Sequence, residues 1–113
     1  MALTITDGTA TISTTEYFLA SASTVKTDQT DDCLLSMWIN IEAIAAADVF
    51  RIKLYEKVSA AAAQQSMEIG VLSGAQVFPW LAPMLFVGHA WEVSVTKISG
   101  TNRTVRWSLR KAT

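Results

Sequence analysis

Strict alternation of apolar and polar residues constrains the fold of this chain more than any other feature of its sequence. Within residues 49–56, Phe50, Ile52 and Leu54 are separated by Arg51 and other polar residues. Residues two positions apart point to the same face of an extended strand, whereas a helix would spread them around its circumference. This segment is therefore predicted to be a β-strand with one apolar and one solvated face.

The same alternation returns over residues 91–96 and 104–110, near the C-terminus. It places apolar residues such as Trp91 in the core and leaves Glu92 among the solvated positions. The intervening residues 99–103 contain glycine and asparagine, which tolerate the positive φ angles of tight turns. We therefore expect the last two strands to form an antiparallel hairpin.

Six further patterns complete the predicted strands: residues 3–5, 10–12, 17–19, 33–41, 66–72 and 83–87. A turn at Asp7 and Gly8 is expected to separate the first two. Residues 42–48 and 57–65 are rich in alanine and have high helix propensity, but they are short and lie between strands. We predict loops there, with at most one helical turn each.

These elements place the chain in the all-β class. Strands and helices do not alternate as they do around a parallel sheet, and no linker divides the 113 residues. Short strands at a spacing of roughly ten residues are typical of sandwiches and barrels. The sequence thus predicts a single domain, residues 1–113, folded as an antiparallel β-sandwich or jelly-roll-like barrel of about seven to eight short strands.

Charge and composition narrow the class of function. The net charge is −1, which argues against a nucleic-acid binder. Only 17% of the residues are charged and 50% are hydrophobic, so either another chain covers part of the surface or the surface is a neutral one rich in Ser, Thr and Ala. Cys33 is the only cysteine, which excludes an intrachain disulfide and fits a reducing compartment.

No targeting or membrane segment is recognisable in the sequence. The N-terminus has neither the basic nor the apolar region of a signal peptide. The longest apolar stretch, residues 77–90, is interrupted by prolines and is too short to span a bilayer. We expect a soluble protein that is made in the cytoplasm and has no membrane partner.

Candidate catalytic and metal-binding residues are few. His89 is the only histidine, and no Gly-x-Ser-x-Gly turn supplies a nucleophile. Asp28, Asp31 and Asp32 form an acidic cluster, but the segment lacks the glycine and the distal glutamate of a calcium-binding EF-hand loop, so we predict a solvated turn. No phosphate-binding loop or dinucleotide motif is present. No catalytic residue, metal site or cofactor is predicted, and the protein is not expected to be an enzyme.

A basic stretch near the C-terminus allows two interpretations. Arg106 and Arg110 share the solvated face of the last predicted strand, and Arg103 precedes them. Together they form a possible basic patch, which residues 51–53 would extend if the two strands were neighbours. The alternative is an ordinary solvated face on which the arginines pair with acids such as Glu92.

Four tryptophans are many for a chain of this length. Trp91 and Trp107 fall on apolar faces and are predicted to be core residues. Trp38 falls opposite the apolar face of its strand, whereas Trp80 follows Phe78 and Pro79, where a core role and an interface role are equally open. Exposed aromatic side chains bind sugars or other protein surfaces. The candidate interface residues are Phe78, Trp80, Phe86 and Trp38.

Three stretches resemble small virion proteins of tailed bacteriophages: residues 9–17, 47–57 and 91–97. The resemblance is one of general pattern and extends over about a quarter of the chain. It implies a β-sandwich that decorates or cements a capsid, or an accessory part of a tail. Such proteins act as oligomers on a lattice, so the implied partners are further copies of the chain and a major capsid or other virion protein, and the implied location is the virion.

Two hypotheses from different classes follow. The first is a non-enzymatic phage virion structural protein, most specifically a capsid decoration or cement protein, that acts by burying apolar side chains at interfaces. Its polar N-terminal segment would be an arm that orders on binding. The alternative is a carbohydrate-binding β-sandwich module, or a tail accessory protein, that uses Trp38 or Trp80 as a stacking platform.

Overall fold

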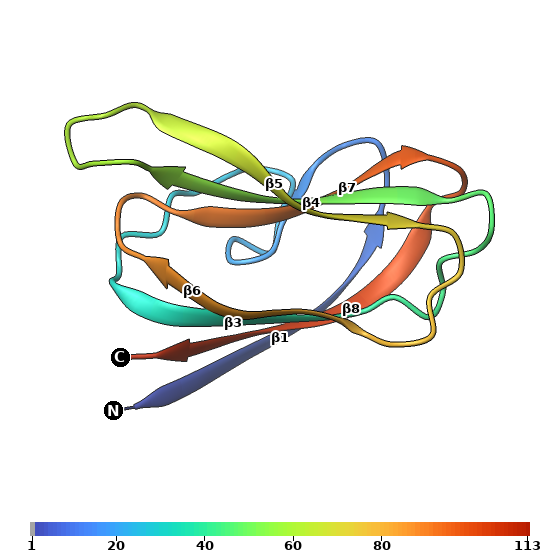
Figure 1. Cartoon of the computed structure of the whole chain (residues 1–113), viewed down its shortest axis with the longest axis horizontal. Coiled ribbons are helices and arrows are strands. Elements are labelled where there is room, and N and C mark those ends of the chain that lie inside the picture. Colours follow the sequence, from blue (N-terminus) through green and yellow to red (C-terminus); the bar gives the residue numbers. More distant parts are fainter. Residues whose placement is uncertain (1) are drawn as a thin grey trace.

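The computed structural model describes residues 2–113, with Pro83 described by its backbone alone. It confirms the predicted all-β class, because two antiparallel sheets pack face to face as a β-sandwich (Figure 1). The eight strands are β1 (Leu3–Ile12), β2 (Tyr17–Phe18), β3 (Cys33–Asn40), β4 (Val49–Lys57), β5 (Gln64–Ser73), β6 (Trp80–Val87), β7 (Glu92–Ser99) and β8 (Arg103–Ala112). The alanine-rich segments between β3 and β4 and between β4 and β5 are loops, as predicted.

The strands divide equally between the two sheets. One sheet has the order β1-β8-β3-β6, and the other has the order β2-β7-β4-β5. Consecutive strands β4 and β5 form a hairpin, whereas the other neighbours within a sheet are separated in sequence. Both ends of the chain lie at the same end of the sandwich (Figure 1), where Ala2 and Thr113 exchange two backbone hydrogen bonds.

The predicted hairpin of the last two strands is wrong. β7 pairs with β2 and β4, whereas β8 pairs with β1 and β3 in the opposite sheet. The loop between them crosses from one sheet to the other, and Gly100 takes a φ of +94° within it. Asp48 fixes this crossing, because its carboxylate accepts a hydrogen bond from the backbone N–H of Thr101 and pairs with Arg103 at 2.6 Å.

β1 corrects two further expectations. Its residues pair with β8 continuously from Leu3 to Ile12, without the predicted turn at Asp7 and Gly8. Gly8 is needed for packing instead, since a Cβ there would fall 2.1 Å from the Trp107 indole. The N-terminal segment is therefore a strand of the sheet and not a free arm.

The first half of β7 is buried on both of its faces. Its apolar side chains lie in the core, as predicted, but Glu92 and Ser94 on the other face are also fully buried. The segment of residues 16–21 covers them: Glu16 accepts a hydrogen bond from the Ser94 hydroxyl, and the backbone N–H of Ala20 donates to Glu92 at 2.9 Å. The expected solvated position of Glu92, and its pairing with the C-terminal arginines, are therefore wrong.

The hydrophobic core lies between the two sheets. Trp91 and Trp107 belong to it, as predicted, and so does Cys33. The central strands contribute one apolar face each, and burial of this surface is the main stabilising contribution to the fold. The core side chains of β3 and β4 are Cys33, Leu35, Met37, Ile39, Phe50, Ile52 and Leu54.

Candidate functional site

The strongest candidate site is the outer face of the β1-β8-β3-β6 sheet. This name, the outer face, denotes the side chains of that sheet that point away from the other sheet. Cross-strand pairs share one face, so the register arranges these side chains in rows across the four strands. They are Leu3, Ile5, Asp7, Thr9, Leu34, Ser36, Trp38, Asn40, Leu81, Met84, Phe86, Arg106, Ser108, Arg110 and Ala112.

A large part of the outer face is apolar. Its well-exposed apolar side chains are Leu3 at 64%, Ile5 at 52%, Leu81 at 40%, Met84 at 63% and Phe86 at 80%. One uninterrupted apolar row consists of Leu3, Ala112, Leu34 and Phe86. A groove of about 330 Å³ runs beside this row, between Leu3, Leu34 and Met84. The apolar side chains therefore form a connected surface and not scattered single residues.

Sequence reasoning missed most of this surface. Leu3 and Ile5 occupy odd positions, whereas Ala10 and Ile12, which face the core, occupy even positions. In one continuous strand the two pairs must point to opposite faces. The predicted turn at Asp7 and Gly8 divided this strand in two, so the opposite orientation of the two pairs was not recognised. Met84 was missed because a register shift interrupts β6, which has two residues opposite one residue of β3 at this point.

Trp38 lies within the outer face, as its position opposite the apolar face of β3 predicts. Its indole Nε1 donates a hydrogen bond to the Ser36 hydroxyl at 3.0 Å. The guanidinium of Arg110 lies over its ring, 4.2 Å from the centroid, in a cation–π contact. One face of the indole is therefore covered, and Trp38 forms part of a fixed surface.

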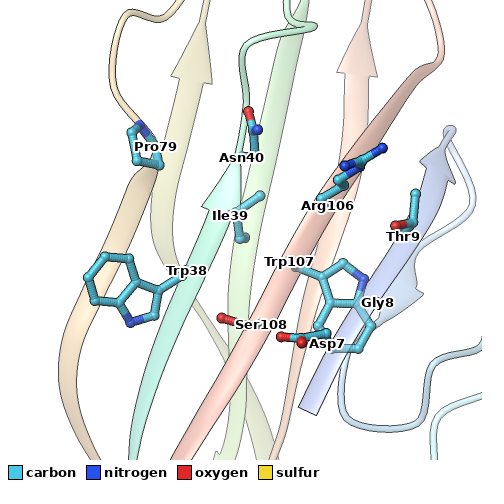
Figure 2. A pocket seen from close by; sticks show the side chains of 10 residues that line it. All are labelled: Asp7, Gly8, Thr9, Trp38, Ile39, Asn40, Pro79, Arg106, Trp107 and Ser108. Atoms are coloured by element: carbon cyan, nitrogen blue, oxygen red, sulfur yellow. The ribbon is translucent and has the colours of Figure 1, made fainter. Parts of the chain in front are cut away.

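A second, more polar groove of about 580 Å³ adjoins Trp38. Figure 2 shows the Ser108 hydroxyl between Trp38 and Asp7, with Asn40 and Arg106 toward the other end of the groove. A hydroxyl, a carboxylate, an amide and a guanidinium thus line the same groove as an aromatic ring. The charges of Asp7 and Arg106 balance, so the groove suits a neutral polar ligand better than an ion.

Trp80 is directed toward the core rather than the outer face. It is the cross-strand partner of Ile39, which is fully buried, and it packs against the core cluster. A Cβ at Gly70, on β5 of the other sheet, would lie only 2.9 Å from the Trp80 indole. Trp80 therefore connects the β6 edge of one sheet with the β5 edge of the other.

The four candidate interface residues do not form one cluster. Trp38 and Phe86 share the outer face, on neighbouring strands. Phe78 is highly exposed in the loop before β6, and it lines a separate small groove with Val77 and Pro79. The structure therefore brings together two of the four.

The possible basic patch is also divided. Arg103 pairs with the buried carboxylate of Asp48, whose pKa is lowered to about 2 by this contact and by backbone hydrogen bonds. Arg106 and Arg110 remain together on the outer face, and within residues 2–113 neither forms an ion pair. Residues 51–53 belong to β4 in the other sheet and do not extend the patch.

His89 and Cys33 line a third groove, of about 810 Å³. The His89 side chain is exposed, and its backbone N–H donates to the Glu56 carboxylate at 2.8 Å. Burial, with a smaller effect of the Asp31 charge, raises the pKa of the Cys33 thiol. Because the thiolate is the reactive form of cysteine, this environment argues against Cys33 as a nucleophile.

Two aspartates of the acidic segment before β3 form ion pairs with lysines. Asp31 pairs with Lys111 at 2.9 Å, and Asp28 pairs with Lys26 at 3.5 Å. Asp32 is exposed. Within the part of the chain that the structure describes, no three His, Cys, Asp or Glu side chains are grouped so as to hold a metal ion.

Comparisons with known proteins give no match: no family model, no curated protein and no solved structure is similar to this chain. A helix of the length and apolar character needed to cross a membrane is likewise not found among residues 2–113. The functional argument therefore depends on the geometry and the charges of the outer face.

Proposed function

We propose that this chain is a non-enzymatic structural protein of a phage virion, most specifically a capsid decoration or cement protein. The observation that carries the proposal is the outer face, on which five apolar side chains are exposed over a four-stranded sheet. Monomeric proteins rarely expose contiguous apolar patches larger than a few hundred Å², and larger ones mark surfaces that other molecules cover. The proposed mechanism is burial of the outer face against other virion chains.

The physical basis of this mechanism is apolar burial on a preorganised surface. Removal of apolar surface from water contributes about 25 cal/mol per Å², from which the entropic cost of association is subtracted. Phe86 and Met84 have the most to contribute, since both are large and mostly exposed. The backbone beneath Phe86 is paired with Leu34 of β3, so little chain entropy is lost there on binding.

The contact is proposed for the face of the sheet and not for its β6 edge. A free edge strand presents unpaired backbone groups that can bind a strand of another chain. In β6, however, Pro83 lacks a backbone donor, and the register shift interrupts the regular ladder. Both features hinder the addition of a further strand and leave the outer face as the larger contact surface.

The virion setting is supported by the resemblance of residues 9–17, 47–57 and 91–97 to small virion proteins of tailed phages. These stretches fall mainly in β1, β4 and β7, which belong to both sheets. The resemblance thus concerns the scaffold of the sandwich, while the outer face supplies the proposed contact.

Mass spectrometry of virions purified by density-gradient centrifugation tests this proposal. The expected result is that the chain co-purifies with the major capsid protein in a fixed ratio and in many copies per particle. Purified chain should also bind to particles that lack it. The variant Phe86→Glu should lose this binding, whereas Val71→Glu on the other sheet should retain it. Absence of the chain from purified virions would overturn the proposal.

A carbohydrate-binding module is the second candidate, and the 580 Å³ groove beside Trp38 favours it. Sugars stack on aromatic rings, and their hydroxyl groups can donate hydrogen bonds to a carboxylate such as that of Asp7 and exchange them with an amide such as that of Asn40. The stacked Arg110 weighs against it, because a sugar must displace the guanidinium or use the other face of the ring. Glycan binding that is lost in Trp38→Ala and kept in Phe86→Ala would favour this candidate over the first.

A further inference from the structure

We infer that the partner of the outer face is a second copy of this chain, packed face to face about a two-fold axis. The inference deepens the proposed function, and rests on it in taking the outer face to be a contact surface between virion chains. The loss of particle binding in Phe86→Glu then follows from separation of the two copies that bind as a pair. Closed two-fold dimers are the commonest protein assemblies, and in them one surface patch contacts the same patch of the other copy. The extent, the exposed apolar side chains and the charges of the outer face favour such self-association.

The extent of the outer face fits one standard interface. The molecule measures 40 × 29 × 20 Å, and Figure 1, a view along the shortest axis, shows both sheets edge-on. The outer face therefore extends up to 40 Å along the strands and 20 Å across them. A stable standard interface buries roughly 800 Å² on each partner, which is close to the whole of this surface.

The sizes and positions of the side chains on the outer face suit packing of one sheet on another. Stacked sheets lie about 10 Å apart, with side chains of moderate size between them. Trp38, the largest side chain of this surface, is held under the Arg110 guanidinium and by its hydrogen bond to Ser36. The apolar residues around it come from all four strands, so a facing sheet of the same kind meets apolar side chains along its full width.

The charged side chains of the outer face form no ion pair within residues 2–113 of one copy. These side chains are Asp7, Arg106 and Arg110. Asp7 lies on β1, and the two arginines lie on β8. In a two-fold pair, Asp7 of each copy can therefore form an ion pair with an arginine of the other copy.

Sedimentation equilibrium and light scattering of the full chain over a wide concentration range test the inference. The expected mass is that of two chains, with dissociation on dilution. Ile5→Glu and Phe86→Glu should raise the dissociation constant at least about 30-fold, since each replaces an apolar side chain of the interface, one on each edge strand, with a charge that must be desolvated. Val71→Glu is the matched control, because Val71 is 49% exposed on the edge strand β5, as Ile5 is 52% exposed on the edge strand β1.

The outcomes separate this inference from the proposed function. A monomer at every concentration, a mass of three chains, or an equal effect of Val71→Glu would overturn the two-fold pairing, even if the chain is found in virions. A dimer that Ile5→Glu and Phe86→Glu dissociate supports the pairing, even if the chain is absent from virions. Circular dichroism of each variant at the same temperature identifies any that is unfolded. Leu3→Glu, at a position of the outer face that is 64% exposed, then replaces that variant.

Discussion

Gly8 on β1 lies directly beneath the indole of Trp107 on β8, so that a Cβ at Gly8 would fall 2.1 Å from the Cζ2 atom of Trp107. The two residues are cross-strand partners on the inner face, and Trp107 is 96% buried by this arrangement of sheet and core, with only 4% of its surface exposed. The absence of a side chain at position 8 is therefore what allows the indole to lie flat against the edge strand.

Gly8→Ala should destabilise the protein. The methyl group overlaps the indole of a ring that is almost fully buried, so either the ring or the edge strand must shift, and we expect a loss of about 1–3 kcal/mol from overpacking. Gly88→Ala is the control, because its nearest neighbour is the flexible carboxylate of exposed Asp32 at 2.9 Å. Urea denaturation of both variants measures the difference, and equal stabilities would contradict the packing role of Gly8.

The pairing of Asp48 with Arg103 should make stability depend on acid pH. The folded protein lowers the pKa of Asp48 from 3.8 to about 2, first through the hydrogen bond from Arg103 and then through those from Thr101 and Ala45. The resulting stabilisation is fully present above pH 4 and is lost as the pH falls through 2. Asp48→Asn should flatten this part of the curve of unfolding free energy against pH, and Arg103→Met should flatten it in part. If the unfolding free energy of Asp48→Asn depends on acid pH as that of the original protein does, other groups cause the dependence.

Glu92 should produce a slope of opposite sign at higher pH. Burial raises the pKa of this carboxyl above 4.5, although hydrogen bonds from Ser21 and Val93 oppose the shift. The folded state thus binds the proton more tightly than the unfolded state, so its contribution is present below pH 4.5 and is lost as the pH rises through the raised pKa. Glu92→Gln keeps an oxygen that accepts from the N–H groups of Ala20 and Val93 and should remove this slope. If the slope persists in Glu92→Gln, the carboxyl is not its source.

Trp80 and Phe86 should differ sharply when each is replaced by alanine. Trp80 packs against the core and approaches Gly70 on the other sheet, so Trp80→Ala should cost about 3 kcal/mol of stability. Phe86 is 80% exposed, and Phe86→Ala should change the stability of the dissociated chain by less than about 0.5 kcal/mol. Thermal unfolding at low protein concentration provides the comparison, and a large loss in Phe86→Ala would place that ring in the core.

The class of the fold and most strands could be predicted because alternation is a local property of the sequence. Which strands pair is not local, and this is why the hairpin of β7 and β8 was wrong. The loop with Gly100 has the same turn residues whether it joins two paired strands or two sheets. The difference comes from Asp48, which lies far away in sequence and holds Thr101 and Arg103.

The candidate site was predictable only in part, for a similar reason. Trp38 and Phe86 were predicted as interface residues because exposed aromatic side chains commonly bind other surfaces. Leu3 and Ile5 were not, because an apolar residue that alternates with threonine is expected to face the core, and only the pairing of all of β1 with β8 turns them outward. Glu92 shows the converse: a polar residue at an outward position is buried when a distant segment covers it.

The central claim, that another chain covers the outer face, is tested most directly by the oxidation rates of two methionines. Met84 on the outer face is 63% exposed, Met67 on the other sheet is 45% exposed, and Met37 in the core is fully buried, so the chain carries its own controls. Oxidation by dilute peroxide, read by mass spectrometry at increasing protein concentration, reports the exposure of each sulfur. We predict that assembly slows the oxidation of Met84 by about tenfold or more and leaves that of Met67 unchanged. Oxidation of Met84 that stays faster than that of Met67 at every concentration, and in purified virions, would contradict the claim.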